Sequence, residues 1–308
     1  MLGRGVAERL RDDPRAPLLH PALVEAAQWA DLFVLNLECC VSARGAPVGE
    51  RGKRFFFRAP PVAAERLAEM GVACVTLANN HVLDFGLDAL DDTLRHLAVA
   101  GIATAGAGAD RERARASVTL SAAGHRLRVL AAADHPASYA AGRDTSGIAF
   151  TDLHRHGVPD WLRDAARPDD GELVLVSVHW GPNMVDGPVP HVRSAAERLE
   201  ASGATLVAGH SAHVPHPVRG RVLFDLGDFL DDYRVDPVLR NDLSLLWLVT
   251  LDASGPQRVE GIPACLEYAY TRPADRAETA QLARLLADRC AALGSQVELA
   301  GDRLVFGS

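Results

Sequence analysis

The stretch VACVTLANNH, residues 72–81, carries a short apolar run directly into a cluster of polar side chains. The run itself, Val72 to Leu77, is typical of a strand that is buried on both faces of a sheet. A helix is predicted on either side of it, over Pro60 to Met70 and over Leu87 to Ala100, and a glycine closes each of these segments. A buried strand between two helices predicts an α/β fold.

The same alternation of apolar runs and amphipathic segments continues along the chain. After Asp228 the pattern changes to longer strands, an amphipathic helix over Ala274 to Leu293 and a last strand pair over Val297 to Phe306, which predicts an α+β tail. No internal repeat, low-complexity tract or linker rich in Pro, Gly or Ser divides the sequence, so one domain is expected. The remaining strands are predicted at Leu32 to Leu35, Leu127 to Ala132, Leu173 to Val178, Leu206 to Ala208, Val222 to Leu226, Leu243 to Leu251 and Val259 to Leu266.

Composition and charge exclude several classes of protein. Hydrophobic residues make up 48% of the 308 residues, which excludes a disordered or fibrous chain. The net charge of -8, with no basic window, gives no electrostatic support for binding nucleic acid. No uncharged apolar run approaches the roughly 18 residues of a membrane span, and the charged opening is unlike a signal peptide, so a cytoplasmic location is expected. The five cysteines lack a CxxC spacing and are expected to be reduced.

Polar side chains follow five of the predicted strands at the point where each strand ends. Functional groups in α/β sheets lie beyond the carboxyl ends of the strands, so these side chains are expected to share one edge. A set of His, Asp, Glu and Asn without cysteine suits Zn, Mn or Fe, and two metal ions would explain the number of ligands. Such ions polarise a phosphoryl oxygen and activate a water, while a neighbouring histidine protonates the leaving group. The five groups are Asn36-Leu37-Glu38, Asn79-Asn80-His81, His179-Trp180-Gly181, Gly209-His210-Ser211-Ala212-His213 and Gly227-Asp228.

Each of these groups also has a structural interpretation. The spacing of His210 and His213, with small residues between them, favours a shared ion, whereas His179 alone is compatible with either role. Taken alone, Asn79-Asn80-His81 is a turn, because Asn tolerates the left-handed conformation and serves as a cap. Asp84 either caps the following helix or orients His81 through a hydrogen bond, and the sequence leaves both open. Purely structural roles on helix faces or in loops are expected for His20, His96, His125, His154, His156 and His191.

A set of motifs, in order over nearly the whole chain, carries a resemblance to a known family. These motifs are Met1-Leu2-Gly3-Arg4, Asn36-Leu37-Glu38, Ala78-Asn79-Asn80-His81-Val82-Leu83-Asp84-Phe85-Gly86, His179-Trp180-Gly181-Pro182-Asn183, Gly209-His210-Ser211-Ala212-His213-Val214 and Leu226-Gly227-Asp228-Phe229. They resemble the bacterial capsule synthesis CapA family, which is associated with poly-γ-glutamate biosynthesis and has a fold similar to the calcineurin-like metallophosphoesterases. The resemblance implies a four-layer α/β/β/α sandwich with two divalent metal ions. Residues 1–240 would form its metal-site sheet region and residues 241–308 its C-terminal completion.

The resemblance also assigns roles to individual residues. Glu38 stands where a bridging carboxylate is expected, and His81 takes the general-acid position, with Asp84 as its catalytic neighbour. Phe55-Phe56-Phe57-Arg58 offers an aromatic wall and a cation for an anionic substrate, with core packing as the alternative for the aromatic residues. By the same resemblance, Asn80, His179 and His210 would hold one metal and His213 the other, while Asn36, Arg58 and Asn79 would bind substrate.

The first motif of the family reads Gly-Asp-x-Met-Leu-Gly-Arg, and this sequence begins at its methionine. The first metal would therefore lack one carboxylate, and the natural protein is expected to start upstream with a short apolar strand. The alternative is a family member that has lost this carboxylate. The leading hypothesis is a metal-dependent hydrolase that cleaves a phosphate ester, or an amide or peptide-like bond, in a small molecule or an acidic polymer. The rival is an accessory protein that binds polyglutamate or serves cell-envelope assembly through a degraded metal site.

Overall fold

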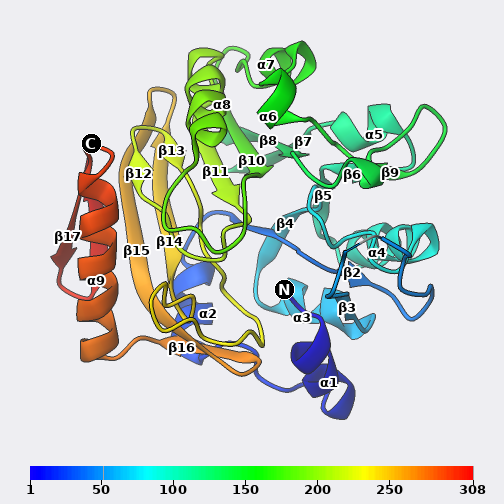
Figure 1. Ribbon diagram of the computed structural model, residues 1–308, viewed down its shortest axis with the longest axis horizontal. Helices are drawn as coiled ribbons and strands as arrows, with labels where there is room; N and C mark the ends of the chain where they lie inside the picture. The colour runs from blue at the N-terminus through cyan, green and yellow to red at the C-terminus, as the bar shows by residue number, and fades with distance from the viewer. Residues whose placement is uncertain (51, 308) are drawn as a thin grey trace.

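The computed structural model describes residues 1–50 and 52–307 and has the mixed α/β character predicted from the sequence (Figure 1). A three-stranded parallel sheet has the order β1 (Phe33–Asn36), β4 (Val72–Thr76) and β5 (Ala103–Ala105). The helices α3 (Val62–Glu69) and α4 (Leu87–Val99) connect these strands. All but β5 match predicted segments, because an apolar run with a glycine or proline boundary is a strong local signal.

A six-stranded sheet positions two histidines of the candidate site, His179 and His210. Its central strand β10 (Glu172–His179) is buried at every residue and pairs in parallel with β8 (His125–Ala133) and β11 (Leu206–His210). The register places His179 opposite His210, so two imidazoles end neighbouring strands at the same level. The outer strands of this sheet are β7 (Val118–Ala122), β12 (Val218–Arg219) and β13 (Val222–Leu223).

The C-terminal part has the α+β character predicted for it. A five-stranded antiparallel sheet contains β14 (Leu243–Asp252), β15 (Gly255–Glu267), β18 (Arg303–Gly307) and β17 (Gln296–Ala300) in that order, with β16 (Tyr270–Pro273) paired to β15. Helix α9 (Arg276–Ala291) packs beside this sheet and begins with a capping box, in which Asp275 and Glu278 satisfy each other's backbone N–H groups.

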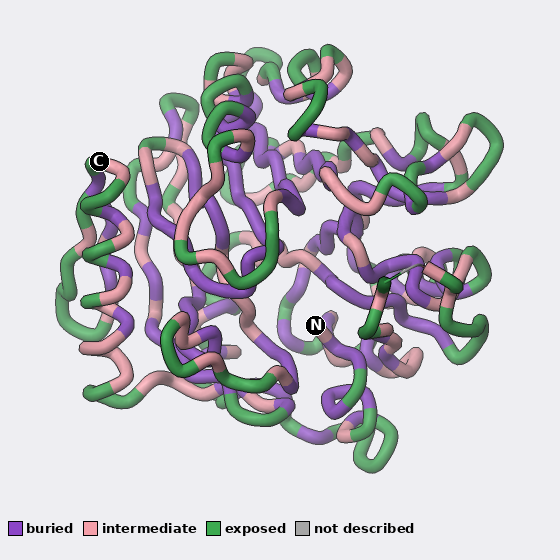
Figure 2. Tube along the Cα trace, viewed as in Figure 1, coloured by how far each residue is buried: buried purple, intermediate pink, exposed green. Residues whose placement is uncertain are grey.

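The apolar core runs through all of these sheets (Figure 2). One cluster extends from Leu2 to Phe306, and a second packs β10 and β11 against α8 (Pro190–Ala201). The five cysteines are free and buried, and burial raises the pKa of Cys39 to about 11. Within residues 1–50 and 52–307, none of the helices combines the length and the apolar character that crossing a bilayer demands. The remaining elements are α1 (Arg4–Asp12), α2 (Pro21–Gln28), β2 (Cys40–Val41), β3 (Arg58–Ala59), β6 (Ala107–Gly108), α5 (Arg111–Arg115), η1 (Ala137–Tyr139), β9 (Gly147–Ile148), α6 (Leu153–His156) and α7 (Asp160–Ala165).

Candidate functional site

Two neutral histidines form the centre of the site, at the ends of β10 and β11. The Nδ1 atoms of His179 and His210 lie 2.8 Å apart, so one ring donates a hydrogen bond to the other. Burial, reinforced by the surrounding histidines, lowers the pKa of His210 to about 3 and the pKa of His179 well below its ordinary value. The Nε2 atom of His179 is buried and has no hydrogen-bond partner. An uncharged imidazole with a free nitrogen is the form that binds a metal ion.

A chain of hydroxyl groups connects His210 to the three-stranded sheet. The Nε2 atom of His210 lies 3.0 Å from Ser177 Oγ, which lies 3.0 Å from Thr76 Oγ1 on β4. Both ring nitrogens of His210 are therefore engaged within the protein. His210 must release one of these contacts before it can bind an ion.

His213 differs from the other two because it faces a carboxylate. Its Nδ1 atom lies 3.0 Å from Asp228 Oδ1. Burial is the largest influence and lowers the pKa of His213, but Asp228, helped by two further acidic side chains, outweighs it and raises the pKa to about 10. At neutral pH this ring is a cation paired with Asp228, and it must lose its proton before it can bind a metal.

The turn that presents His213 is tight, as the small residues between the two histidines predict. Ser211 has a φ of 132° and His213 a φ of 63°. The fully buried Asp225 holds this turn by accepting hydrogen bonds from the backbone N–H groups of Ala212 and Gly227, at 2.8 Å and 2.9 Å. Burial raises the pKa of Asp225 to about 7.

Asp84 orients His81 and does not cap the following helix. The helix α4 begins after Gly86 and has no side-chain cap. Asp84 Oδ2 instead lies 2.6 Å from His81 Nδ1 and accepts a hydrogen bond of 2.7 Å from the backbone N–H of Phe57. Its Oδ1 atom lies 2.9 Å from Lys53 Nζ and 3.2 Å from the hydroxyl of Tyr139. Four donors fix one buried carboxylate, so His81 carries its proton on Nδ1 and turns Nε2 toward the site.

Glu38 is buried beside His81 and has an unsatisfied oxygen. Its Oε1 atom lies 3.9 Å from His81 Nε2 and has no hydrogen-bond partner. Its Oε2 atom accepts a hydrogen bond of 3.4 Å from the side-chain amide of Asn36. Asn80 Oδ1 is likewise buried without a partner. Buried polar atoms in folded proteins are almost always paired, so these two oxygens are acceptors that are still available to a ligand.

Two of the residues assigned to substrate binding are engaged in the scaffold. The fully buried Asn79 accepts hydrogen bonds from the backbone N–H groups of His81 and Val82 and donates to Asn36 Oδ1 and Leu37 O, which is the turn role that its type suggests. The Arg58 guanidinium donates to two backbone carbonyls and lies 4.2 Å from the centre of the Phe85 ring. Of the three consecutive phenylalanines, Phe57 is buried and its ring lies 4.1 Å from His81.

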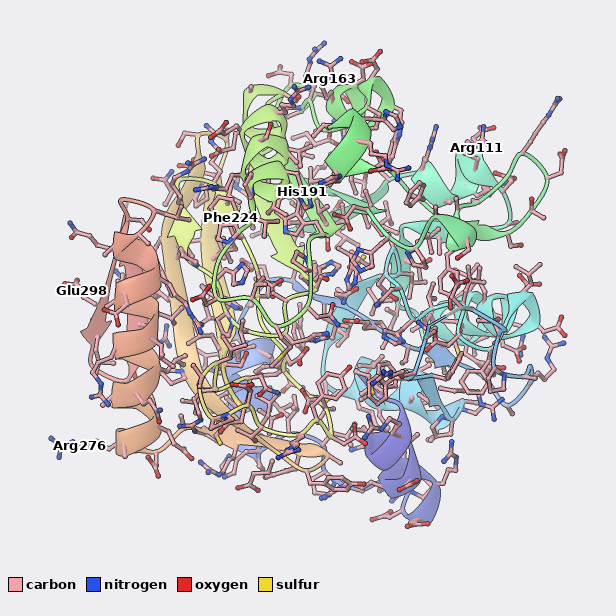
Figure 3. All side chains as sticks on the ribbon, viewed as in Figure 1. Arg111, Arg163, His191, Phe224, Arg276 and Glu298 are labelled. Atoms are coloured by element: carbon pink, nitrogen blue, oxygen red, sulfur yellow. The ribbon has the colours of Figure 1, made fainter. Side chains whose placement is uncertain are left out.

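The strand-end pattern contains a sixth polar group that the sequence analysis did not single out. Asp134 and His135 directly follow β8, and the His135 ring lies 4.9 Å from His179. Asp134 contacts His135 Nδ1, lies 3.4 Å from Nε2 of His191, which is labelled in Figure 3, and accepts a hydrogen bond from the backbone N–H of Gly181. Applying the same rule to the predicted strand over Leu127 to Ala132 would have found this pair.

The structure thus brings Glu38 close to His81, and His179 close to His210 and His135. The donors are nitrogen and oxygen atoms only, which fits the divalent cations expected from the sequence. Among residues 1–50 and 52–307, however, no three His, Cys, Asp or Glu side chains already converge on one point as a metal site. The donor atoms therefore fit a divalent cation, but side chains must move before three of them can coordinate one ion.

Comparison with known proteins places these motifs in one family. The family model described as bacterial capsule synthesis protein PGA_cap matches residues 1–233. A probable polyglutamine synthesis accessory protein of Mycobacterium tuberculosis strain H37Rv is 37% identical over 242 residues, which are 73% of this chain and 63% of that protein. The PGA biosynthesis protein CapA of Bacillus subtilis is 27% identical, over 54% of this chain and 44% of its own length.

The capsule biosynthesis protein CapA of Bacillus anthracis is 27% identical, over 58% of this chain and 45% of its own length. These matches span less than two thirds of each curated relative. Among solved structures, a hypothetical protein from Thermus thermophilus superposes with a TM-score of 0.43 at 16% identity, covering 82% of this chain and 88% of that one. From the family match over residues 1–233, the chain belongs to the bacterial capsule synthesis protein PGA_cap family.

Proposed function

We propose that this chain is a metal-dependent hydrolase of the metallophosphoesterase type that acts on an anionic substrate in capsule or poly-γ-glutamate biosynthesis. The proposal includes a single domain whose sheets form a four-layer α/β/β/α sandwich. The observation that carries it is the set of buried acceptor atoms without partners, Glu38 Oε1, Asn80 Oδ1 and His179 Nε2, beside strand ends. Leaving such atoms unpaired costs about 1–3 kcal/mol each, which a bound ion or substrate would recover.

Glu38, Asn80, His179, His210 and His213 are the residues that would hold two divalent ions. When bound, such ions polarise a phosphoryl or carbonyl oxygen and make a water more acidic. His210 contributes after giving up its contact with His179 or with Ser177. His213 contributes after losing a proton, and Asp228 is placed beside it to stabilise the cation when no ion is bound.

His81 is the group placed to move a proton. The hydrogen bond from Nδ1 to Asp84 leaves Nε2 as the atom that faces the substrate side, 3.9 Å from Glu38. A proton carried on Nε2 can be donated to the leaving group, while Asp84 holds the orientation of the ring through Nδ1. Lys53 and Tyr139 in turn keep Asp84 from rotating away. Asn36, whose amide contacts Glu38, lies at the same edge and would orient the substrate.

The first experiment measures bound metal after equilibrium dialysis against Mn²⁺ or Zn²⁺. The intact chain should bind two equivalents, and His210→Ala and His213→Ala should each lose binding while the fold is kept. His156→Ala is the matched control, because His156 is exposed at the end of α6. His81→Ala should retain metal and hydrolyse bis-p-nitrophenyl phosphate about 10²- to 10⁴-fold more slowly. Unchanged stoichiometry in both ligand variants would remove the metal assignment.

A second candidate function is that of a non-catalytic accessory protein that binds an acidic polymer. It is favoured by the name of the 37% identical mycobacterial relative, an accessory protein, and by both ring nitrogens of His210 being engaged within the protein. The same dialysis experiment separates the two candidates. Metal-free protein that binds poly-γ-glutamate with unchanged affinity in His210→Ala would support the accessory role over hydrolysis.

A further inference from the structure

His135 flanks His179 but has no role among the residues proposed to hold metal. The centre of its ring lies 4.9 Å from the centre of the His179 ring, and the ring centres of His179 and His210 lie 5.0 Å apart. Two imidazoles that bind one ion place their ring centres about 5 Å apart, because each ligating nitrogen lies about 2.1 Å from the metal. Both neighbours of His179 are therefore at the spacing of ligands.

Asp134 fixes the orientation of the His135 ring. Its Oδ1 atom contacts His135 Nδ1, and its Oδ2 atom accepts a hydrogen bond of 2.9 Å from the backbone N–H of Gly181 and lies 3.4 Å from His191 Nε2. The backbone N–H of Asp134 donates a hydrogen bond of 2.9 Å to His179 O, which ties the end of β8 to the end of β10. A carboxylate on one ring nitrogen is the usual partner of a metal-binding histidine, because it sets the tautomer and turns the other nitrogen toward the ion.

His135 can bind an ion without giving up a hydrogen bond. Within the described part of the chain, its ring takes part only in the contact of Nδ1 with Asp134, which leaves Nε2 free. The Nε2 atom of His179 is also free, and it is buried. Both ring nitrogens of His210, by contrast, are engaged with His179 and Ser177. His135 and His179 are therefore the two imidazoles that can share an ion with the least rearrangement.

The His135 ring faces both of the neutral histidines and also reaches the surface. Its side chain is 34% exposed, whereas His179 and His210 are buried. Burial is the first influence that lowers the pKa of His179 and of His210, and a positive charge on His135 is the second for both rings. An ion from solution can therefore reach the buried pair at His135.

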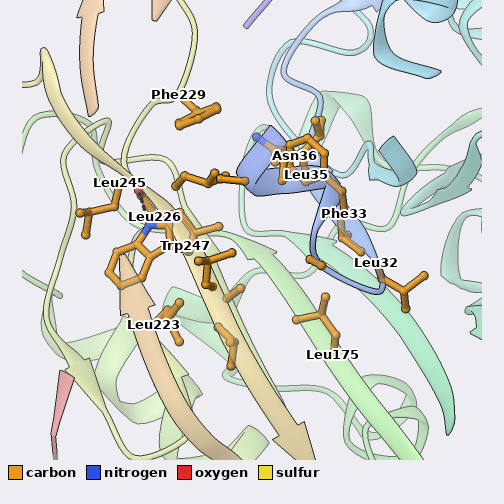
Figure 4. A pocket seen from close by; sticks show the side chains of 18 of the residues that line it. Leu32, Phe33, Leu35, Asn36, Leu175, Leu223, Leu226, Phe229, Leu245 and Trp247 are labelled. Carbon is orange, nitrogen blue, oxygen red and sulfur yellow. Dashed lines mark hydrogen bonds between the residues drawn. The ribbon is translucent and has the colours of Figure 1, made fainter. Parts of the chain in front are cut away.

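A cavity of about 830 Å³ reaches the candidate site from the side of β1 and β14 (Figure 4). Glu38, His210 and His213 line it, whereas His135 and His179 are not among the described residues that do so. His210 lies between the two regions, because it lines the cavity and contacts His179. The candidate site therefore has two parts, with His213 and Glu38 beside the cavity and His179 beside His135.

We propose that His135 is a further ligand of the ion that His179 holds, bound through Nε2, and that Asp134 is the positioning residue that presents this nitrogen. The inference rests on the proposed metal-dependent function and names an additional donor for one of its two ions. His135 and His179 supply the two free imidazoles, and His210 joins them after giving up one of its contacts. The carboxylate of Asp134 makes the His135 ring more basic and so strengthens its bond to a metal.

The test measures the binding of Co²⁺, because the absorption spectrum of a cobalt ion reports the ligands around it. Dissociation constants and spectra are recorded for the parent chain, His135→Ala, His135→Cys and Asp134→Asn, and circular dichroism checks that each variant is folded. His125→Ala and His125→Cys are the matched controls, because His125 is exposed at the opposite end of the same strand, β8. The five native cysteines are buried and give the same background in every chain.

His135→Ala should bind one of the two Co²⁺ ions more than about 100-fold more weakly, and free imidazole should restore part of this loss by taking the place of the ring. Asp134→Asn should weaken the same ion by about 10- to 100-fold, which is the usual effect of losing a group behind a ligand. His135→Cys should show the near-ultraviolet absorption of a cobalt thiolate, because a thiolate is itself a metal ligand. Both His125 variants should bind and absorb as the parent chain does.

The outcomes separate this inference from the proposed function. A parent chain that binds two Co²⁺ ions, together with unchanged affinity in His135→Ala, would overturn the role of His135 and leave the proposed function standing. A parent chain that binds no Co²⁺ would overturn both. Weaker binding in His135→Ala that imidazole does not restore, with no thiolate absorption in His135→Cys, would assign His135 a structural role and overturn its place as a ligand.

Discussion

Asp84→Asn replaces one oxygen of a buried carboxylate with an amide nitrogen and leaves the side-chain volume almost unchanged. Asp84 accepts from four donors: Lys53 and Tyr139 at Oδ1, and the Phe57 backbone and His81 at Oδ2. An amide has one acceptor oxygen, so the two donors that face its nitrogen lose their partner. His81 can respond by moving its proton to Nε2, but the Phe57 N–H cannot respond.

The expected loss of unfolding free energy follows from two of these contacts. A buried N–H without an acceptor costs about 1–3 kcal/mol. The Lys53 side chain is 11% exposed, and removing the charged partner of such a buried pair costs about 3–5 kcal/mol. The cost of the unpaired Phe57 N–H and the cost of the lost charge beside Lys53 are not additive, because both arise from the same substituted side chain. We therefore expect a total of about 3–5 kcal/mol, out of the roughly 5–15 kcal/mol by which proteins of this kind are stable.

The assay is urea unfolding at pH 7, followed by tryptophan fluorescence and far-ultraviolet circular dichroism. Asp91→Asn is the control, because Asp91 is exposed on the adjacent helix α4 and its replacement should stay within about 0.5 kcal/mol. Nitrogen chemical shifts of the histidine ring should place the His81 proton on Nδ1 in the parent chain and on Nε2 in Asp84→Asn. A loss under about 1 kcal/mol, or a parent ring protonated on Nε2, would refute the role given to Asp84.

Three further outcomes are expected. Burial lowers the pKa of His216 to about 4, so between the ordinary histidine pKa and pH 4 the unfolded chain takes up a proton that the folded ring does not. This difference removes about 3 kcal/mol of stability as the pH falls from 7 to 4. In urea titrations at the two pH values, His216→Gln should lack that part of the loss. Gly106→Ala should cost about 2–4 kcal/mol in the same assay, because φ is 93° and the new carbon would meet a neighbour at 2.7 Å, whereas Gly101→Ala, with φ 76° and open space, should cost only about 1 kcal/mol. Asp92→Asn should cost about 2–3 kcal/mol, because both oxygens of the buried carboxylate accept hydrogen bonds, from Ser42, Arg44 and Arg95, and an amide keeps only one acceptor oxygen; a urea midpoint equal to that of the parent chain would contradict this role.

The strands and helices could be predicted because burial leaves a periodic trace in the sequence. β10 and β14 are found within one residue of their predicted bounds. The strand expected over Val222 to Leu226 is an exception, since β13 ends at Leu223. Beyond Leu223 the regular pairing stops, although the Leu226 N–H still donates to Gly209 O of β11. The buried Asp225 between them accepts a hydrogen bond from the backbone of Ala212, a tertiary contact that has no local signal in the sequence.

The site was predictable only as far as its parts follow strand ends. Glu38 and His210 were found in this way, because each lies at or just beyond the end of a strand. The pairing of Lys53 with Asp84 has no signal in the sequence, because 31 positions separate the two residues and neither lies on a predicted strand. For the same reason, the sequence left open whether Asp84 caps the following helix or orients His81. Which side chains form an ion pair depends on long-range packing, and local sequence patterns do not encode that packing.

The hydrogen bonds that connect His179, His210, Ser177 and Thr76 can run in either donor-to-acceptor direction. If His179 donates from Nδ1, His210 must donate from Nε2 to Ser177, and the Ser177 hydroxyl is then free to donate to Thr76. If His179 accepts instead, every one of these bonds reverses. A ligand that takes the lone pair at His179 Nε2 therefore fixes the direction of both hydrogen bonds of His210 and leaves the Ser177 hydroxyl free to donate to Thr76. The tautomer of the His179 ring at the end of β10 thus determines whether the Ser177 hydroxyl can donate across to Thr76 on β4.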